Sequence, residues 1–573
     1  MENPEVAQIF DEVADLLELE GQNPFRIRAY RNAARVVRDL PEPVASIVRD
    51  SPEKLTEFAG IGDDLAGKIA TIVQTGDLPL RQELCKEVPA GLREMMSVPG
   101  CGPKRVQLLY KQLAIESVAD LLKAAERHAI RELKGFGAKT EENILKALAQ
   151  LPQTSRRFYL ADAKPYADAL VSHLKQAPGV AQIAVAGSFR RRKETVGDLD
   201  VLATCRHAKG VMDRLNGFEG VAETLARGTT KSAVRLRCGL QVDLRVVPEK
   251  SYGAALQYFT GSKQHSILLR RLAQEQGLKI NEYGVFRGNR RIAGQTEEEV
   301  YAAVGLPWIP PELREGRNEI DLARAGRLPT LLELDDIRGD LHMHTTATDG
   351  RSSIVDMIRA AKERGYKYIA ITDHSKRVTM AKGLDARRLR KHWRDIEDAA
   401  AEVKGMTVLK GVEMDILEDG RLDLPNDVLK EADWVLASIH YGQNQSQKQI
   451  TRRIVNAIRC PYVHAIAHPT GRLIGKRPAY QIDLEEVFKA AADFGCLLEL
   501  NGQPSRLDLD EVALATAKEA GVGIVLGTDA HSTEELRFME FGVYQARRAG
   551  LEAKDVANAR SLAQFRGTLK HSA

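Results

Sequence analysis

The sequence predicts a multidomain protein that combines α+β and α/β folds. Apolar residues recur at spacings near 3–4 over residues 1–150, strand-like and helical runs mix over residues 155–300, and short apolar runs alternate with charged helical stretches beyond residue 336. The first pattern indicates a helical N-terminal region, and the last is typical of a β/α barrel, with seven strand-like runs. The length of 573 residues is enough for roughly four domains.

The composition excludes several classes of protein. Hydrophobic residues make up 43% and charged residues 28% of the chain, which excludes a largely disordered or collagen-like protein. No apolar run approaches the ~18 residues of a membrane span, and the start of the chain does not resemble a signal peptide. The 6 cysteines form no CxxC pair. We therefore expect a cytoplasmic protein with reduced thiols and no membrane partner. The net charge of +4 is too balanced to indicate a nucleic-acid partner by itself.

The helical region contains a weak repeat in which an apolar residue, a Gly-x-Gly pair and an amphipathic helix follow one another three times. The glycines allow a tight turn, and backbone N–H groups at the next helix start can meet a phosphate oxygen. The unit resembles a helix-hairpin-helix, which contacts the DNA backbone rather than its sequence. A single copy is better explained as a turn between helices, but three copies with the same flanks favour DNA binding. The glycines are Gly60, Gly62, Gly100, Gly102, Gly135 and Gly137.

Three aspartates in strand-like runs form the first candidate site. Asp198 and Asp200 are two residues apart and so point to one face, and Asp243 lies in another strand-like run. Three convergent carboxylates can hold two Mg²⁺ ions about 4 Å apart, which stabilises the attacking and leaving oxygens of phosphoryl transfer. Gly187 and Ser188 would offer an N–H and a hydroxyl to a triphosphate. Taken alone, the D-x-D pair fits polar positions at a solvated strand end equally well.

The spacing Gly-Ser-x9-Asp-x-Asp is the signature of nucleotidyltransferases, and the match goes further. Residues 258–262 (YFTGS), residues 280–286 (INEYGVF) and the N-terminal stretch NPFRIRAYRNAARVV resemble the family X DNA polymerases of the beta type. The resemblance covers roughly residues 1–315. It implies a small helical N-terminal domain, helix-hairpin-helix units that grip DNA, a palm with the three aspartates, and a nucleotide-selecting C-terminal subdomain.

The resemblance also implies roles for single residues. Asp198 and Asp200 match the pair that holds both metal ions, and Asp243 matches the carboxylate that activates the primer 3′-hydroxyl. Arg270 matches a residue on the template side. The positions that match contacts to the triphosphate or sugar of the incoming nucleotide are Gly187, Ser188, Arg191, Tyr258, Phe259 and Gly261.

Two positions depart from the animal enzymes of this family, and a third is ambiguous. Lys263 stands where those enzymes have an acidic residue, and a cation there could hold the triphosphate before DNA arrives. Ser266 stands in place of a base-contacting asparagine, which puts that minor-groove contact in doubt. Lys68 aligns with the Schiff-base lysine of the animal lyase, and Tyr30 with a neighbour of it. A lysine on a helix after Gly-x-Gly is usually a phosphate contact, so both roles for Lys68 stay open.

A stretch near residues 305–335 contains four prolines and predicts a linker to the C-terminal body. Beyond it, strand-like runs end repeatedly in metal-ligating residues. The carboxyl ends of barrel strands converge on one face, so ligands far apart in the sequence come together. Imidazoles with carboxylates suit Zn²⁺ or Mn²⁺ rather than Ca²⁺, and nine ligands fit three ions if a carboxylate such as Glu413 bridges them. The nine are His342, His344, Asp349, His374, Glu413, His440, His468, Asp529 and His531.

Hydrogen-bonded core histidines would explain one or two of these residues, but not ligands on six of seven strands. We assign no ligand role to His392 or His464. The pattern H-x-H, I-T-D-H, G-x-E, I-H, A-H-P and D-x-H resembles the PHP family (polymerase and histidinol phosphatase), a seven-stranded β/α barrel with a trinuclear metal centre, over roughly residues 336–570. Clustered cations lower the pKa of bound water to about 7 and neutralise phosphate charge. Arg472, Lys476 and Arg477 either approach a phosphate backbone or lie on a solvated loop.

Together the resemblances imply a bacterial family X DNA polymerase fused to a PHP domain. Such a repair enzyme fills short gaps from a template and trims 3′ ends as a metal-dependent 3′→5′ exonuclease, and the same pocket suits a 3′-phosphatase or an abasic-site endonuclease. We expect a monomer that acts on gapped or nicked DNA and dNTPs, with Mg²⁺ in the polymerase site and Mn²⁺ or Zn²⁺, up to three ions, in the PHP site. Two alternatives stay open: a PHP domain that hydrolyses pyrophosphate or small phosphomonoesters, and a DNA-end-binding scaffold with weak catalysis.

The predicted boundaries follow from these assignments. They are 1–85 for a lyase-like helical domain with the first helix-hairpin-helix, 86–152 for DNA-binding helix-hairpin-helix fingers, 153–250 for the nucleotidyltransferase palm, 251–315 for the nucleotide-selecting subdomain, 316–335 for the linker and 336–573 for the PHP barrel.

Overall fold

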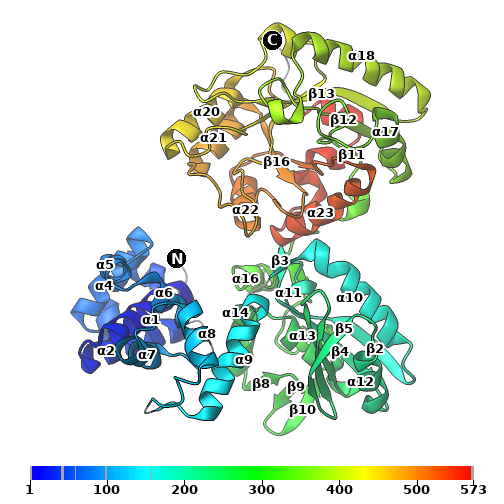
Figure 1. The fold of residues 1–573 in the computed structure, drawn as a ribbon. Helices are drawn as coiled ribbons and strands as arrows, with labels where there is room; N and C mark the ends of the chain where they lie inside the picture. The colour runs from blue at the N-terminus through cyan, green and yellow to red at the C-terminus, as the bar shows by residue number, and fades with distance from the viewer. Residues whose placement is uncertain are drawn as a thin grey trace. The chain divides into compact units, whose positions relative to one another are not determined.

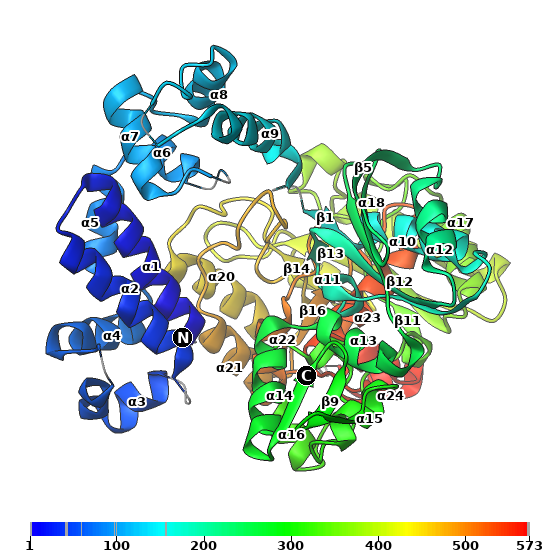
Figure 2. The same cartoon turned by 90° about the horizontal axis from the view of Figure 1, so that it is seen from below.

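The computed structural model describes residues 3–40, 44–58, 60–96, 98, 100–133, 135–154 and 157–569. The chain divides into two compact units, Met1–Arg156 and Arg157–Ala573. The first is drawn in blue to cyan and the second in cyan to red (Figures 1 and 2). Within the described residues, no helix has both the length and the apolar character needed to cross a membrane.

The first unit contains only helices in its described part. Their apolar faces meet in one core that includes Phe10, Leu17, Ile72 and Met95, as expected for amphipathic helices. The elements are α1 (Asn3–Glu20), α2 (Pro24–Asp39), α3 (Val44–Asp50), the 3-10 helix η1 (Pro52–Glu57), α4 (Asp63–Thr75), α5 (Pro79–Glu87), α6 (Ala90–Met95), α7 (Pro103–Leu113), α8 (Val118–Glu126) and α9 (Ala138–Thr154).

The three Gly-x-Gly motifs form three equivalent turns, which precede α4, α7 and α9. The first glycine of each motif has a positive φ, of 97° at Gly60, 92° at Gly100 and 97° at Gly135, a conformation that favours glycine. In each turn the residue between the glycines donates its N–H to the carbonyl three residues earlier, as Ile61 does to Phe58. The predicted sequence repeat is therefore also a structural repeat.

A five-stranded sheet in the order β2-β4-β7-β6-β5 forms the palm. β4 and β7 are parallel, and the other neighbouring pairs are antiparallel. One face packs on α10 and α12 through residues such as Val201, and Leu202 on the opposite face packs towards α13. The elements are β1 (Phe158–Tyr159), α10 (Leu160–Lys175), β2 (Val180–Val185), α11 (Gly187–Arg190), β3 (Thr195–Val196), β4 (Asp198–Cys205), α12 (Ala208–Asn216), β5 (Val221–Arg227), β6 (Lys231–Leu236) and β7 (Gln241–Val246).

The next subdomain combines helices with a three-stranded antiparallel sheet. Its Glu297 binds the fully buried Arg314 at 2.6 Å and also Arg190 of α11, at 2.8 and 2.7 Å, which ties the subdomain to the palm. Burial would raise the pKa of Glu297, but the two guanidinium groups lower it to about 2. The elements are α13 (Tyr252–Thr260), α14 (Lys263–Glu275), β8 (Leu278–Asn281), β9 (Gly284–Arg287), β10 (Arg290–Ala293) and α15 (Glu297–Ala302).

The segment 316–335 contains α16 (Glu319–Arg324), and near its end Leu332 is fully buried in the core of the barrel. Seven parallel strands follow in sequence order, and a parallel bridge between Met343 and Ala530, each three residues past the end of its strand, links the segments after the first and the last strand. The predicted β/α barrel is thus confirmed. Its elements are β11 (Gly339–Asp340), α17 (Ile354–Glu363), β12 (Tyr368–Ile371), α18 (Ala386–Glu402), β13 (Thr407–Asp415), α19 (Asn426–Leu429), β14 (Trp434–Ser438), α20 (Gln447–Arg459), β15 (Ala465–Ile466), α21 (Leu484–Phe494), β16 (Leu497–Asn501), α22 (Glu511–Glu519), β17 (Ile524–Gly527), α23 (Met539–Arg548) and α24 (Leu562–Arg566).

The alternation of side chains along the strands places the polar residues at one end of the barrel. Inward-facing apolar residues, among them Leu409 and Leu436, form an inner core that Phe565 of α24 closes. Glu413 lies four residues beyond Leu409 on β13 and therefore also faces inward. His440 lies four residues beyond Leu436, just past the end of β14. The carboxyl ends of the strands thus present polar side chains above an apolar floor.

Candidate metal centres and nucleotide site

β4 and β7 bring the three palm aspartates together. Asp200 lies directly opposite Asp243 in the parallel register, and Asp198 precedes it by two residues on the same face. Burial and the neighbouring aspartates raise the pKa of Asp200 to about 6, and burial and Asp243 raise the pKa of Asp198. Carboxylates that disfavour one another's charge in this way favour a bound cation. Among the described residues, only the barrel contains groups of three or more possible ligand atoms that all lie within 4.8 Å of one another. The carboxylate oxygens of the three palm aspartates are farther apart than that.

The turn after β2 lies against these aspartates. Gly187 has a φ of 61°, and a Cβ at this position would come within 2.6 Å of Asp200 Oδ2. Both the backbone conformation and the space therefore require glycine. Ser188 follows in the short helix α11, so the predicted N–H and hydroxyl contacts lie next to the predicted metal ligands.

Arg191 connects this turn to the neighbouring subdomain. Its Nη1 donates to the carbonyl of Thr260 at 2.5 Å, and its Nε donates to Glu315 Oε1 at 3.1 Å. A Cβ on Gly261 would lie 3.2 Å from Arg191 Nη1, so Gly261 is close to the same guanidinium. The structure thus brings Gly187, Arg191 and Gly261 into one region, with Arg191 bound to protein oxygens.

The remaining predicted nucleotide residues lie on α13 and α14. Tyr258 and Phe259 near the end of α13 meet edge to face at 5.1 Å, and the guanidinium of Arg245 on β7 lies 4.6 Å from the centre of the Phe259 ring. Lys263 is the first residue of α14 and is exposed. Arg270 lies two turns further along the same helix and is exposed as well.

The environment of Lys68 bears on the lyase prediction. Its Nζ lies 2.5 Å from Asp64 Oδ2 and 5.2 Å from the centre of the Tyr30 ring, which is buried. Burial acts to lower the pKa of Lys68, but Asp64 and Tyr30 outweigh it and the pKa is raised. A lysine attacks a carbonyl only when it is unprotonated. These contacts therefore oppose Schiff-base chemistry, and the lyase role stays a prediction.

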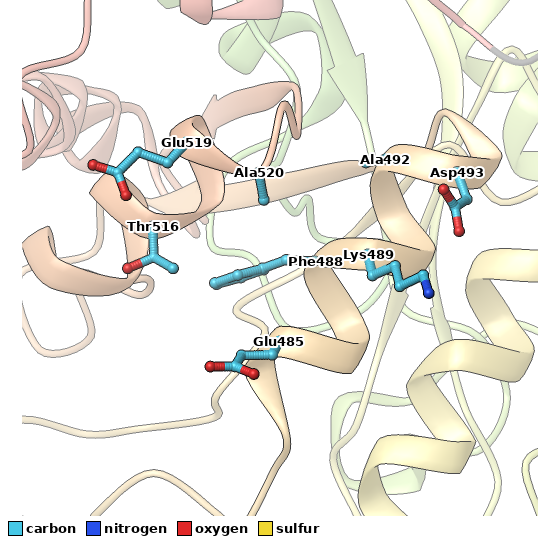
Figure 3. Close-up of a pocket in the computed structure, with 8 residues that line it drawn as sticks. All are labelled: Glu485, Phe488, Lys489, Ala492, Asp493, Thr516, Glu519 and Ala520. Atoms are coloured by element: carbon cyan, nitrogen blue, oxygen red, sulfur yellow. The ribbon is translucent and has the colours of Figure 1, made fainter. Parts of the chain in front are cut away.

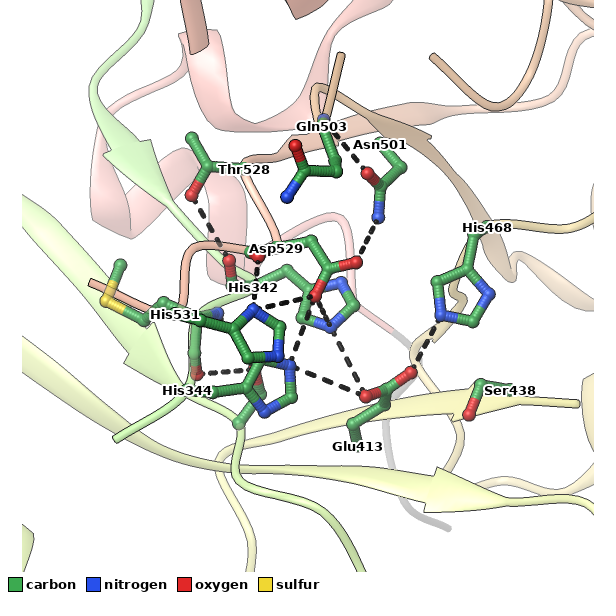
Figure 4. Close-up of polar contacts among 12 residues, drawn as sticks. His342, His344, Glu413, Ser438, His468, Asn501, Gln503, Thr528, Asp529 and His531 are labelled. Atoms are coloured by element: carbon green, nitrogen blue, oxygen red, sulfur yellow. Dashed lines mark hydrogen bonds and ion pairs between the residues drawn. The ribbon is translucent and has the colours of Figure 1, made fainter. Parts of the chain in front are cut away.

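All nine predicted barrel ligands converge at the carboxyl ends of the strands. Figure 4 shows six of them, which are His342, His344, Glu413, His468, Asp529 and His531. They form three groups that share members: His344 belongs to the first and second, and His374 to the first and third. The overlap places the three groups beside one another, so that neighbouring ions could be held in one cluster. The groups are His344, Asp349, His374 and His531; His342, His344 and Asp529; and His374, Glu413 and His440. The ninth residue, His468, hydrogen-bonds Glu413 at 2.9 Å.

Glu413 lies at the centre of this cluster. Its Oε2 is 2.8 Å from His374 Nδ1 and 3.5 Å from both His342 Nε2 and His344 Nε2, and its Oε1 is 3.5 Å from His440 Nε2. A carboxylate with histidines on both oxygens is suited to bridge two ions, as the sequence predicts.

Several buried polar atoms of the cluster form no hydrogen bond of normal geometry, although some of them lie close to an oppositely charged group. Because buried polar groups in proteins nearly always have a partner, such atoms fit ligands of metal ions. They are His342 Nε2, His344 Nδ1 and Nε2, His374 Nδ1, Glu413 Oε2 and His468 Nδ1.

The charge states of Glu413 and His344 suit metal binding. In contrast, carboxylate neighbours outweigh burial and raise the pKa of His374 to about 10 and that of His531 to about 9, so that these two imidazoles would have to lose a proton to bind a metal ion. Burial alone would raise the pKa of Glu413, but His374, His440 and His342 hold it well below its usual range. Burial and the neighbouring His374 lower the pKa of His344 to about 4, so that its imidazole is neutral at pH 7. An ionised carboxylate and a neutral imidazole are the forms that bind metal ions.

A second layer of acidic residues, which the sequence analysis did not identify, orients the histidines. Glu499 on β16 binds His342 Nδ1 at 2.6 Å and accepts the backbone N–H of His468 at 2.7 Å. Asp415 on β13 accepts the backbone N–H of His440 at 2.9 Å and lies 3.1 Å from its Nδ1. Such partners fix the ring orientation of a metal-binding histidine. Glu499 lies two residues beyond an inward-facing apolar residue of β16. This alternation along the strand could have shown from the sequence that Glu499 also faces into the barrel.

The residues excluded as ligands have structural roles. His392 Nε2 lies 2.9 Å from Asp373, and His464 Nδ1 accepts the backbone N–H of Val435 at 3.0 Å. Arg472, for which a phosphate contact or a solvated loop was considered, instead hydrogen-bonds Glu194 of the palm.

A hollow on the outside of the barrel offers no comparable chemistry. It lies between α21 and α22 and is lined by residues such as Phe488, Lys489 and Thr516 (Figure 3). It contains no histidine, cysteine or palm aspartate. The convergence of ligands, and not the size of a pocket, therefore identifies the candidate sites.

Five parts of the chain match known protein families. Residues 161–272 match the DNA polymerase beta palm, and residues 255–315 match the DNA polymerase beta thumb. Residues 1–78 match a helix-hairpin-helix domain, residues 92–150 a SAM-like helix-hairpin-helix tandem, and residues 340–503 the PHP domain.

Similarity to single proteins extends over the whole length. The chain is 39% identical over 576 residues to the Bacillus subtilis (strain 168) protein named DNA polymerase/3'-5' exonuclease PolX, and the alignment covers 100% of both chains. Proteins named "Probable phosphatase" match a shorter part. One from Thermoanaerobacter sp. (strain X514) is 33% identical over 38% of this chain and 89% of its own length. Another, from Acetivibrio thermocellus, is 32% identical over 34% of this chain and 80% of its own length.

Proposed function

Because the chain belongs to the family X DNA polymerases with a C-terminal PHP domain, we propose that it fills short gaps in DNA from a template and trims 3′ ends as a 3′→5′ exonuclease. The observation that supports this division is the presence of two separate sets of side chains that could bind metal ions. One consists of three aspartates on β4 and β7, and the other of nine histidines and carboxylates at the end of the barrel.

In the palm, the carboxylates and the turn after β2 have complementary tasks. Asp198 and Asp200 would hold Mg²⁺, which prefers oxygen ligands. When bound, the ions neutralise charge on the phosphates of the nucleotide. Asp243, opposite Asp200, would orient the primer 3′-hydroxyl and accept its proton. Gly187 and Ser188 would donate hydrogen bonds to the triphosphate from the start of α11.

In the barrel, the imidazole-rich set suits Mn²⁺ or Zn²⁺, up to three ions. Bound ions supply an activated water and neutralise the phosphodiester. The side chains of Asp349, His440 and His531 are the most exposed of the ligands, at 35%, 20% and 26%. A substrate phosphate would therefore approach beside them, while Glu499 and Asp415 keep the histidine rings oriented.

Gapped or nicked DNA would be held mainly by the first unit. The three hairpin turns at residues 60–62, 100–102 and 135–137 have exposed glycines and each precede the N-terminus of a helix, where N–H groups can bind phosphate oxygens. Such contacts read the DNA backbone and suit an enzyme that acts on gaps of any sequence. The domain boundaries given above are proposed on the same grounds.

A second candidate activity for the barrel is hydrolysis of phosphomonoesters. The relatives named "Probable phosphatase" favour it, because they cover 34–38% of this chain, a share close in length to the barrel. A primer with a 3′-phosphate separates the two activities, because a phosphatase removes only the phosphate whereas an exonuclease shortens the primer.

The purified protein should extend a 5′-labelled primer across a short gap when dNTPs and Mg²⁺ are present. Without dNTPs, in Mn²⁺, it should shorten the same primer from its 3′ end. Each activity corresponds to one set of ligands, so the two reactions should respond differently to the two metals. A protein that binds the gapped DNA but neither extends nor shortens the primer would be a scaffold, contrary to the proposal.

Replacing Lys263 with Asp should weaken dNTP binding in the absence of DNA by about tenfold, because a favourable charge near the triphosphate becomes an unfavourable one. The effect should shrink with salt, because the Debye length falls from ~10 Å at 0.1 M to ~3 Å at 1 M. Calorimetry measures the affinity. Lys209→Asp, which makes the same change at an exposed position on α12, is the control, and equal affinities for the two variants would contradict the assignment.

A further inference from the structure

The turn that carries the predicted triphosphate contacts is held by the barrel as well as by the palm. We call residues 187–194, between β2 and β4, the phosphate loop. Its Arg190 binds Glu297 of the subdomain that follows the palm. Its last three side chains have partners in the barrel: the Tyr544 ring lies 4.2 Å from Arg192, Glu511 lies 3.4 Å from Lys193, and Arg472 and Gln545 both donate hydrogen bonds to Glu194.

Arg548, on α23 of the barrel, makes the most direct contact. Its side chain is fully buried. Its Nη1 donates to the backbone carbonyl of Arg191 at 2.8 Å and to Glu315 Oε1 at 2.9 Å, and its Nη2 donates to Glu511 Oε1 at 2.6 Å. One guanidinium group from the barrel thus holds both the backbone of the phosphate loop and two carboxylates beside it.

The carboxylate of Glu315 is shared between two arginines. The same Oε1 that accepts from Arg548 also accepts from Arg191 Nε at 3.1 Å. The side chain of Glu315 is only 14% exposed, so loss of both partners would leave a buried charge unpaired, at a high cost in free energy. If Arg191 turns to a triphosphate, Arg548 keeps Glu315 paired.

The barrel and the palm pack together around Arg548 and the phosphate loop. Leu507 and Phe541 of the barrel share a hydrophobic core with Phe158 and Phe189 of the palm. α23 lies against this part of the palm (Figure 1). Because close-packed cores transmit displacements, a substitution at Arg548 should displace the phosphate loop.

We propose that Arg548 of the barrel is a positioning residue for nucleotide addition, which fixes the phosphate loop and holds Glu315 when Arg191 turns to the triphosphate. The inference rests on the proposed polymerase activity. Without Arg548, Glu315 would bind Arg191 more firmly and withhold it from the nucleotide. The barrel would then contribute to the polymerase site through this contact, independently of its own metal ligands.

The test is single-nucleotide gap filling by the full chain, with KM for the dNTP and kcat measured separately. Arg548→Gln should raise KM by about tenfold or more, because a charged hydrogen-bond partner is lost, and should change kcat less. Adding Glu315→Gln to Arg548→Gln should restore a lower KM, since no carboxylate then retains Arg191. A merely structural defect would not be relieved in this way. The 3′→5′ nuclease activity in Mn²⁺ should persist in each variant and reports on folding.

Arg547→Gln is the matched control, because Arg547 is the preceding residue on α23 and pairs with Glu312 and Glu333 rather than with the phosphate loop. Its KM should stay near that of the unmodified protein. If Arg548→Gln fails to fold, the single variant Glu315→Gln tests the proposal. It should lower the KM for the dNTP, and an unchanged or higher KM would overturn the proposal. An Arg548→Gln chain with normal KM, or with a raised KM that Glu315→Gln does not relieve, would overturn it too. A parent protein that adds no nucleotide would instead refute the polymerase activity.

Discussion

Asp200→Ala should reduce nucleotide addition by about a thousandfold or more while affinity for gapped DNA survives. Asp200 lies at the centre of the palm site, opposite Asp243 and against Gly187. DNA binding would rest on phosphate contacts by the hairpin turns of the first unit, to which Asp200 does not belong. Primer extension measures the first quantity and gel-shift titration the second.

The variant should also remain folded. The pKa of Asp200 is raised to about 6 by burial and by Asp198 and Asp243, so its ionised form destabilises the metal-free protein above that pH. Removing the carboxylate should therefore leave the melting temperature at pH 8 unchanged or slightly higher when no metal is added. Asp213→Ala, on α12 of the same palm, is the control with normal activity. A parallel loss of DNA affinity and activity in Asp200→Ala would count against the assignment.

The convergence of the candidate barrel ligands could be predicted because nearly all of them lie at or just beyond a strand end. Parallel strands converge at their carboxyl ends in a β/α barrel, so the topology alone brings His342, Glu413 and His440 together. The same reasoning places Asp198 and Asp200 on one face of β4. In both cases the strand period and the order of the strands determine the geometry, and both can be inferred from the sequence.

Contacts between side chains of different subdomains could not be predicted in this way. Nothing in the pattern around Arg548 or Glu511 indicates that they meet the phosphate loop, because their pairing depends on how the barrel packs on the palm. Arg472 illustrates the difficulty, since its basic neighbourhood suggested a phosphate contact whereas it binds Glu194. Glu499 is a different case, because Glu499 and His342 both belong to the barrel: its position two residues beyond an inward-facing apolar residue was an available signal that the sequence analysis did not use.

Glu413→Ala should lower the rate of 3′-end degradation by more than about a hundredfold and leave gap filling in Mg²⁺ largely intact. Glu413 contacts histidines from both of its oxygens, so its loss should release more than one ion from the barrel. Among the residues that the structure describes, no hydrogen bond or ion pair joins the phosphate loop or the palm aspartates to Glu413 or His440. His440→Ala should therefore have the same effect. Asp198→Ala should do the reverse, because it removes a palm ligand and no ligand of the barrel.

Metal analysis measures the ions bound per chain, and two labelled-primer assays measure 3′-end degradation and gap filling in each variant. The Glu413→Ala protein should carry fewer bound ions per chain than the parent, and the Asp198→Ala protein the same number in the barrel. Glu418→Ala, which removes an exposed carboxylate paired with Arg377, is the matched control and should keep both activities. Full nuclease activity in Glu413→Ala would place the nuclease outside the barrel or in a contaminant. Loss of polymerisation along with the nuclease, in a folded protein, would mean that the ions of the barrel support the palm, because Arg548 and its partners remain in place in this variant.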